Sequence, residues 1–157
     1  MKTEVRVRGK ELLKRYRENE EEVKRIFSKE RKVVLAYIFG SSAEGRTNPL
    51  SDLDFAVHLD EELSQKKMRN THTRLLNRLI STLGDEIDLV LMNSADLLMK
   101  FNIIKKGKLI HQRSEREKVM IESNIMDLYM DMKPYRERHV DKTLEKIKKE
   151  GLKLKKK

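Results

Sequence analysis

Apolar positions along the chain predict four strands. Residues 33–39 are seven consecutive apolar residues, which is typical of a strand buried on both faces. Residues 53–59 alternate in a strand pattern, and residues 86–92 form another short pattern of the same kind. Residues 103–110 predict a turn that leads into a last short strand.

Helical periodicity is found before the first strand and between later ones. Residues 10–30 and 61–83 each gather their apolar residues near one stripe, and Gly84 is placed to cap the second of these helices. Ser94 is expected to N-cap a short helix that runs to about residue 101.

The last third of the chain predicts two further helices. Ser114 and Glu117 have the spacing of a capping box, which predicts a helix to about Met132. Pro134 is expected to interrupt it, and a further helix then runs to Gly151. The fold class predicted from this order is α/β (α+β): one small mixed β-sheet flanked by helices, with a C-terminal helical extension.

Residues suited to binding a phosphate group follow the end of the first predicted strand. Gly40 lacks a Cβ atom, so the chain can turn sharply there and a phosphate can approach the backbone. Ser41 adds a hydroxyl group, and a short helix opening at 41–43 would present free N–H groups to an anion.

Carboxylates follow at the next strand. Because strand residues alternate, Asp52 and Asp54 share one face while Leu53 and Phe55 share the other. Two adjacent carboxylates resist joint ionisation unless a cation lies between them, and Mg²⁺ favours such hard oxygen ligands. This pattern predicts a magnesium site.

A third carboxylate comes from the strand pattern at 86–92. Asp88 is the expected ligand, with Glu86 as an alternative on the same face. Three acids on two neighbouring strands would hold two metal ions. His58 shares the face of Asp52 and Asp54, but we expect it to be exposed at the far end of its strand. The remaining histidines lack ligand spacing and are interpreted as surface residues: His72, His111 and His139.

The order Gly40-Ser41, ten intervening residues and Asp52-x-Asp54 resembles the nucleotidyltransferases of the DNA polymerase beta superfamily. Within it, the chain looks most like the small MNT-type nucleotidyltransferases, which are antitoxin partners of HEPN-domain toxins. The resemblance covers roughly residues 30–135. One departure concerns the loop, where many relatives place an arginine directly before the second glycine. Here Glu44 precedes Gly45 and Arg46 follows it.

The resemblance implies transfer of AMP from ATP, with two Mg²⁺ ions, to a hydroxyl group. The implied acceptor is a HEPN-type toxin protein, most plausibly at a tyrosine. Asp52, Asp54 and Asp88 are the implied catalytic metal ligands, and the implied nucleotide-binding residues are Gly40, Ser41, Ser42, Gly45 and Arg46. Two alternatives stay open: transfer to a small molecule or an RNA end, and a catalytically silent antitoxin that neutralises a toxin by contact alone.

Length and composition narrow the class of protein. The chain has 157 residues, which suits one nucleotidyltransferase domain at 1–132 and a basic C-terminal helix and tail at 133–157 that is a candidate partner-binding element. It has no cysteine, which excludes disulfides and thiolate metal sites. The sequence lacks a P-loop pattern, a signal peptide and an apolar stretch of membrane-spanning length, so we expect a cytoplasmic protein.

The net charge of +10 is distributed unevenly along the chain. Residues 1–32 carry +5 and residues 133–157 carry +7, whereas residues 33–132 carry −2. An acidic site-bearing segment does not favour a nucleic-acid cleft, although the basic ends keep RNA binding open. Association with a second copy or with a partner chain also stays open.

The helix before Pro134 holds more apolar residues than one narrow stripe needs. Core packing is the favoured interpretation, and a partner-binding surface is the alternative. The residues concerned are Ile121, Ile125, Met126, Leu128, Tyr129, Met130 and Met132.

Overall fold

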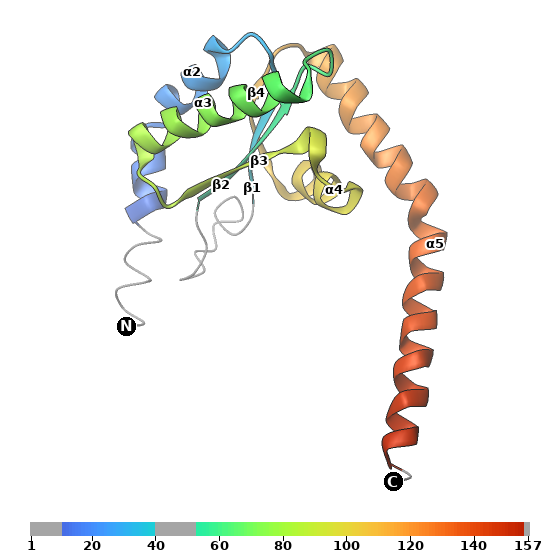
Figure 1. Ribbon diagram of the computed structural model, residues 1–157. Helices are drawn as coiled ribbons and strands as arrows, with labels where there is room; N and C mark the ends of the chain where they lie inside the picture. Colours follow the sequence, from blue (N-terminus) through green and yellow to red (C-terminus); the bar gives the residue numbers. More distant parts are fainter. Residues whose placement is uncertain (1–10, 40–52, 156–157) are drawn as a thin grey trace.

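The computed structural model describes residues 11–39 and 53–155. Four strands form one mixed sheet in the order β3-β2-β1-β4 (Figure 1). Their bounds are β1 Val33–Phe39, β2 Leu53–Leu59, β3 Ile87–Leu91 and β4 Lys108–Gln112. β1 is antiparallel to both β2 and β4, whereas β2 and β3 are parallel. The predicted fold class is confirmed, and β1 and β2 have their predicted bounds.

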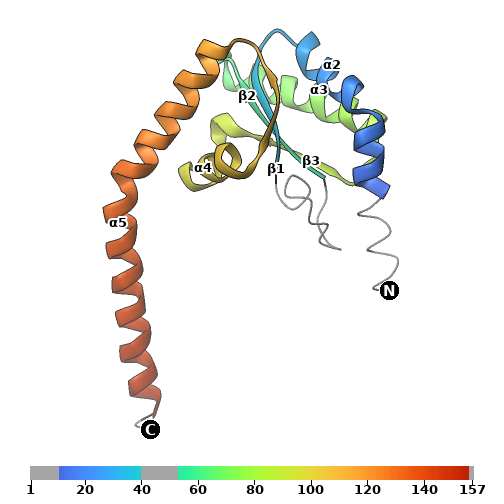
Figure 2. The same ribbon diagram turned by 180° about the vertical axis from the view of Figure 1, so that it is seen from behind.

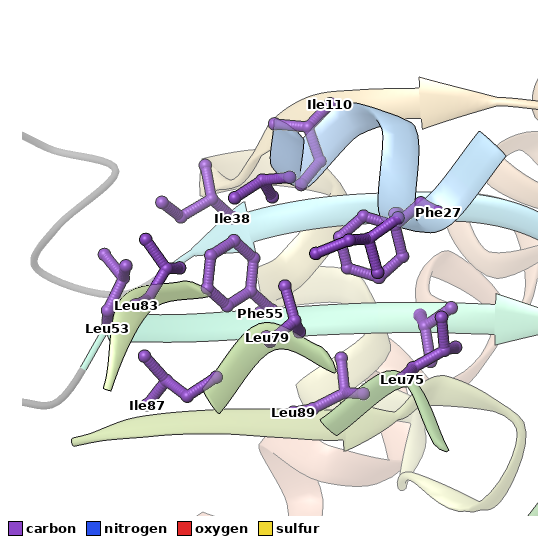
Figure 3. Close-up of a cluster of buried hydrophobic side chains, with 14 of the residues drawn as sticks. Phe27, Ile38, Leu53, Phe55, Leu75, Leu79, Leu83, Ile87, Leu89 and Ile110 are labelled. Carbon is purple, nitrogen blue, oxygen red and sulfur yellow. The ribbon is translucent and has the colours of Figure 1, made fainter. Parts of the chain in front are cut away.

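Helices α2 (Glu20–Lys29) and α3 (Gln65–Leu83) cover one face of the sheet (Figure 1). Their buried side chains interlock with those of the strands in one apolar cluster, in which Phe55 is central (Figure 3). Gly84 ends α3 with a φ of 96°, a conformation that favours glycine, and its N–H group donates to the carbonyl oxygen of Ile80.

Two predicted helix boundaries on this face are wrong. The helix expected at 10–30 is divided by a turn at Asn19, whose side-chain amide and backbone N–H group both donate to the carbonyl oxygen of Arg15. The helix expected from residue 61 begins later, because the Ser64 hydroxyl caps it by accepting from the N–H group of Lys67.

Helices α4 (Leu97–Lys106) and α5 (Glu115–Lys155) lie on the opposite face. Asp96, rather than Ser94, caps α4 by accepting from the N–H group of Met99 at 2.8 Å, and the helix runs past the predicted end at 101. Ser94 instead closes a 3-10 turn, η2 (Met92–Ser94). The predicted cap was therefore two residues too early.

α5 is one continuous helix, so the predicted interruption at Pro134 is wrong. A proline removes the hydrogen bond to the carbonyl group four residues earlier, which here belongs to Met130. Both residues are exposed, so water can solvate that carbonyl group without opening the core. The second half of α5 projects away from the sheet in both views (Figures 1 and 2). The domain boundary predicted at residue 132 falls inside this helix and stays a prediction.

Core packing was predicted for most of the apolar residues of α5 before Pro134, and this is wrong for four of them. Ile125 is buried against the sheet, and Ile121 and Tyr129 are partly buried beside it. The four exposed residues are Met126, Leu128, Met130 and Met132. Within the described residues, no helix has both the length and the apolar character needed to cross a membrane.

Candidate functional site

Two of the predicted acids meet where β2 and β3 run side by side. Asp54 and Asp88 are direct register partners of this parallel pair, so their side chains leave the same face of the sheet. Neighbouring strands lie about 4.8 Å apart, which lets two such carboxylates share one cation. Asp88 is exposed and Asp54 is partly exposed, so the pair is open to a ligand.

The chain order explains why these two strands are neighbours. Parallel strands need a crossover connection, and α3 supplies it between β2 and β3. The carboxylate of Asp88 accepts from the N–H group of Leu89 at 2.9 Å, which restricts its direction. On the other side of β3, His72 of α3 donates from Nε2 to the carbonyl oxygen of Leu89 at 2.5 Å. This contact ties the crossover helix to the strand that carries Asp88.

β1 ends beside the acid pair. Phe39, the last residue of β1, is the register partner of Asp54. The segment 40–52 connects β1 to β2 in the sequence. The remaining predicted site residues lie in that segment, outside the described residues: Gly40, Ser41, Ser42, Gly45, Arg46 and Asp52.

The donor set suits a hard divalent cation. Asp54 and Asp88 offer carboxylate oxygens only, and no cysteine exists in the chain to favour a softer metal. Among the described residues, no group of three His, Cys, Asp or Glu side chains is placed to hold a metal ion. The alternative acid, Glu86, precedes β3, and its carbonyl oxygen accepts from the N–H group of Leu53. The ligand roles of all these acids stay predictions.

His58 lies at the other end of β2, about 13 Å from Asp54 at the usual rise of a strand. It was expected to be exposed, but only 6% of it is. Neither ring nitrogen makes a hydrogen bond to a described residue: Nδ1 is buried without a partner, and Nε2 lies 3.7 Å from a Glu61 carboxylate oxygen. Burial lowers the pKa of His58 below the ordinary value of 6.5. His72 and His111, also expected at the surface, are each partly buried.

A hollow of about 620 Å³ opens beside His58, between the end of β2, α4 and α5. Arg113 fixes one wall, because its guanidinium group donates to Asp60, to Glu117 and to the carbonyl oxygen of Arg31. Ser114 forms the N-cap half of the predicted capping box by accepting from the N–H group of Glu117, while the Glu117 carboxylate accepts from the Ser114 hydroxyl group and from Arg113. The hydrogen bond from the backbone N–H group of Glu62 and the Arg113 charge lower the pKa of Asp60.

This hollow was missed from the sequence. His58 was noticed only because it shares the alternating face of Asp54, and no periodicity predicts that α4 and α5 would close over it. Lys100 lines the hollow from α4, and Asn124 lines it from α5. The hollow and the acid pair thus occupy opposite ends of one strand.

Comparison with known proteins gives the family. The family model for "Polymerase beta, Nucleotidyltransferase" matches residues 21–116, which include β1, β2, β3 and the acid pair. The chain belongs to the polymerase beta nucleotidyltransferase family. The resemblance noted from the Gly-Ser and Asp-x-Asp motif is confirmed.

This nucleotidyltransferase is also similar to individual proteins. It is 31% identical over 81 residues to the protein adenylyltransferase MntA of Aphanizomenon flos-aquae, a match that spans 48% of this chain and 54% of that relative. The similarity thus covers about half the length of the curated relative.

Solved structures share the fold at lower identity. One chain of a mutant MntA–HpeT toxin–antitoxin complex aligns with a TM-score of 0.67 and 21% identity, over 80% of this chain and 98% of that one. A chain of the tri-AMPylated HEPN toxin of Shewanella oneidensis in complex with its MNT antitoxin aligns with a TM-score of 0.62 and 21% identity, over 82% and 98%. A toxin–antitoxin structure with AMP-PNP gives a TM-score of 0.59 and 22% identity, over 87% and 98%.

Proposed function

We propose that this nucleotidyltransferase transfers AMP from ATP to a hydroxyl group on a HEPN-type toxin and so acts as an antitoxin. The observation that carries the proposal is the register pairing of Asp54 with Asp88. Support for the acceptor comes from the relatives, which include a protein adenylyltransferase and toxin–antitoxin complexes. The net charge of −2 over residues 33–132 favours a protein acceptor over an RNA end.

Each predicted site residue has a role in this proposal. Asp54, Asp88 and Asp52 hold magnesium, which supplies charge neutralisation at the phosphates and a lower pKa for the acceptor hydroxyl group. The nucleotide phosphates are bound by the loop residues, which are Gly40, Ser41, Ser42, Gly45 and Arg46. Phe39, which directly precedes Gly40 in the sequence, is the register partner of Asp54, and this supports one reaction centre for both sets of residues.

The reaction itself is an in-line displacement. The acceptor oxygen forms a bond to the α-phosphorus of ATP while the bond from that phosphorus to the bridging oxygen breaks, and pyrophosphate leaves. The hydroxyl proton of the acceptor passes to solvent water. Most of the rate enhancement comes from positioning the two reactants and from neutralising charge.

The test measures label transfer from ATP carrying a labelled α-phosphate to a candidate HEPN protein in the presence of Mg²⁺. Asp54→Asn and Asp88→Asn should each lower the rate at least about 100-fold, because each removes a metal ligand and the metal contributes several kcal/mol. Asp85→Asn is the matched control, since Asp85 is an exposed neighbour that precedes β3. It should keep the wild-type rate.

Other outcomes of this test would support one of the two alternative functions. Label that moves to a small molecule or an RNA end without the HEPN protein would overturn the proposed acceptor. If the wild-type chain binds and neutralises the HEPN protein without transferring label, the protein is a silent antitoxin and the catalytic proposal is wrong. Neutralisation that survives both aspartate substitutions would lead to the same conclusion.

A further inference from the structure

A stripe of exposed apolar residues runs along α5. Its members recur at spacings of three, four and seven residues or their multiples, which places them on one side of a helix. Each is between 41% and 58% exposed: Val119, Met126, Met130, Leu144 and Ile147. Apolar residues repeated in this way are the usual mark of a helix that packs against another helix.

The stripe is distinct from the side of α5 that packs on the sheet. Ile125 is buried, and Tyr129 stacks on Phe101 with ring centroids 3.5 Å apart. Glu122 accepts a hydrogen bond from the Tyr37 hydroxyl group at 2.7 Å. Successive helix residues are about 100° apart, so Met126 points roughly a quarter turn away from Ile125. The packed side of α5 and the stripe therefore serve different contacts.

Charge is divided between the two halves of α5. By sequence, residues 115–132 contain five acidic and two basic residues, a net charge of −3. Residues 133–155 contain four acidic and nine basic residues, a net charge of +5. A parallel pair of such helices would place like charges together, whereas an antiparallel pair would place each acidic half beside a basic half. The helix is thus complementary to a reversed copy of itself.

We propose that α5 pairs in antiparallel orientation with α5 of a second copy of this chain, burying both stripes. The middle of Glu115–Lys155 is residue 135, so a two-fold axis there overlaps the helices along their full length of about 62 Å. Lys133 then lies level with the partner's Glu137, and Met126 lies level with the partner's Leu144. Lys133 and Glu137, which lie between Met130 and Leu144, therefore bring opposite charges together across the axis.

This pairing does not involve Asp54 or Asp88 of either copy. Asp54 and Asp88 lie on β2 and β3, and the second half of α5 extends away from the sheet (Figures 1 and 2). The proposal rests on α5 alone, so it is independent of the proposed adenylyl transfer.

Disulfide trapping tests the orientation, because the native chain has no cysteine. Met126→Cys and Leu144→Cys are made separately, with different tags, and mixed under oxidising conditions. In the proposed pair, residue 126 lies about 27 Å along the axis from its own counterpart, far beyond disulfide reach, but level with residue 144 of the other copy. Only the mixture should form a disulfide dimer.

The matched control uses Asp131→Cys with His139→Cys. These exposed residues are level across the same axis but lie on the opposite side of α5 from the stripe, so their mixture should not cross-link. Cross-linking of Met126→Cys with itself would show a parallel pair and overturn the proposal. A mixture that stays uncross-linked, or that cross-links only to an added HEPN protein, would also overturn it.

Charge exchange gives a second, independent measurement by sedimentation equilibrium of the full chain. Glu137→Lys and Lys133→Glu should each raise the dimer dissociation constant about tenfold, since each places like charges across the axis. The double variant Lys133→Glu/Glu137→Lys should return to within about threefold of the wild-type constant. Helix content by circular dichroism should be equal in all four proteins. A double variant as weak as the single ones would contradict the pairing.

Discussion

The two faces of the sheet receive different kinds of side chain from the same strand, β2. On β2, Phe55 and Val57 point into the cluster beneath α2 and α3, where both are fully buried. Asp54 and His58 alternate with them and point to the α4/α5 face. One face therefore contributes mainly apolar burial, and the other carries the titratable groups. Substitutions at neighbouring positions should separate stability from chemistry.

The largest expected difference between the faces is in stability. Phe55→Ala should lower the free energy of unfolding by about 3–5 kcal/mol, because it leaves a cavity at the centre of the larger cluster. Phe101→Ala, on the α4/α5 face, should lower the free energy of unfolding by less, about 3 kcal/mol, since Phe101 is 7% exposed and its surroundings can collapse more easily. Urea unfolding measures both, and a larger loss for Phe101→Ala would reverse the comparison.

Much of this arrangement could be predicted where one local rule decides. β1 and β2 were found with their exact bounds, because each is a short, strongly patterned run. Asp54 and Asp88 were predicted on neighbouring strands, and the structure pairs these strands in parallel with α3 as the crossover. The family could be predicted from the Gly40-Ser41 and Asp52-x-Asp54 motif, because few families share that spacing.

Features that depend on distant contacts were not predictable. The burial of His58 follows from α4 and α5 closing over β2, and no local pattern records this. Pro134 marked a helix end by propensity, yet its exposed position lets α5 continue. Met126 and Met130 have a core-like pattern but are exposed, because periodicity shows which side of a helix is apolar and not what covers it.

A smaller effect should come from the polar contact that joins α5 to the sheet. The Tyr37 hydroxyl group donates to Glu122, and burial raises the pKa of Tyr37, so it stays a donor throughout the neutral range. Tyr37→Phe should lower the free energy of unfolding by about 1 kcal/mol. Glu122→Gln keeps an acceptor oxygen and should cost less. An unchanged stability in Tyr37→Phe would show that this contact adds nothing to packing on the α4/α5 face.

The smallest effect should appear as a pH dependence at the buried end of the same face. Burial lowers the pKa of His58 in the folded protein, and the Lys100 charge adds to this, although the carboxylates of Glu61, Asp60 and Glu117 oppose it. The unfolded chain therefore binds the proton more readily. As the pH falls below the ordinary value of 6.5, stability should decrease, and it should recover fully above that value.

The ordinary histidine pKa limits the size of this change to at most about 0.8 kcal/mol at pH 6. Urea unfolding between pH 5.5 and 8 measures it, with His58→Gln as the variant that cannot titrate. The variant should lose most of the slope and keep only a remainder from His111, whose pKa burial also lowers. If His58→Gln kept the full slope, His58 would be protonated as easily in the folded protein as in the unfolded chain. On the α4/α5 face, β2 would then carry a charged side chain at both ends, His58 as well as Asp54.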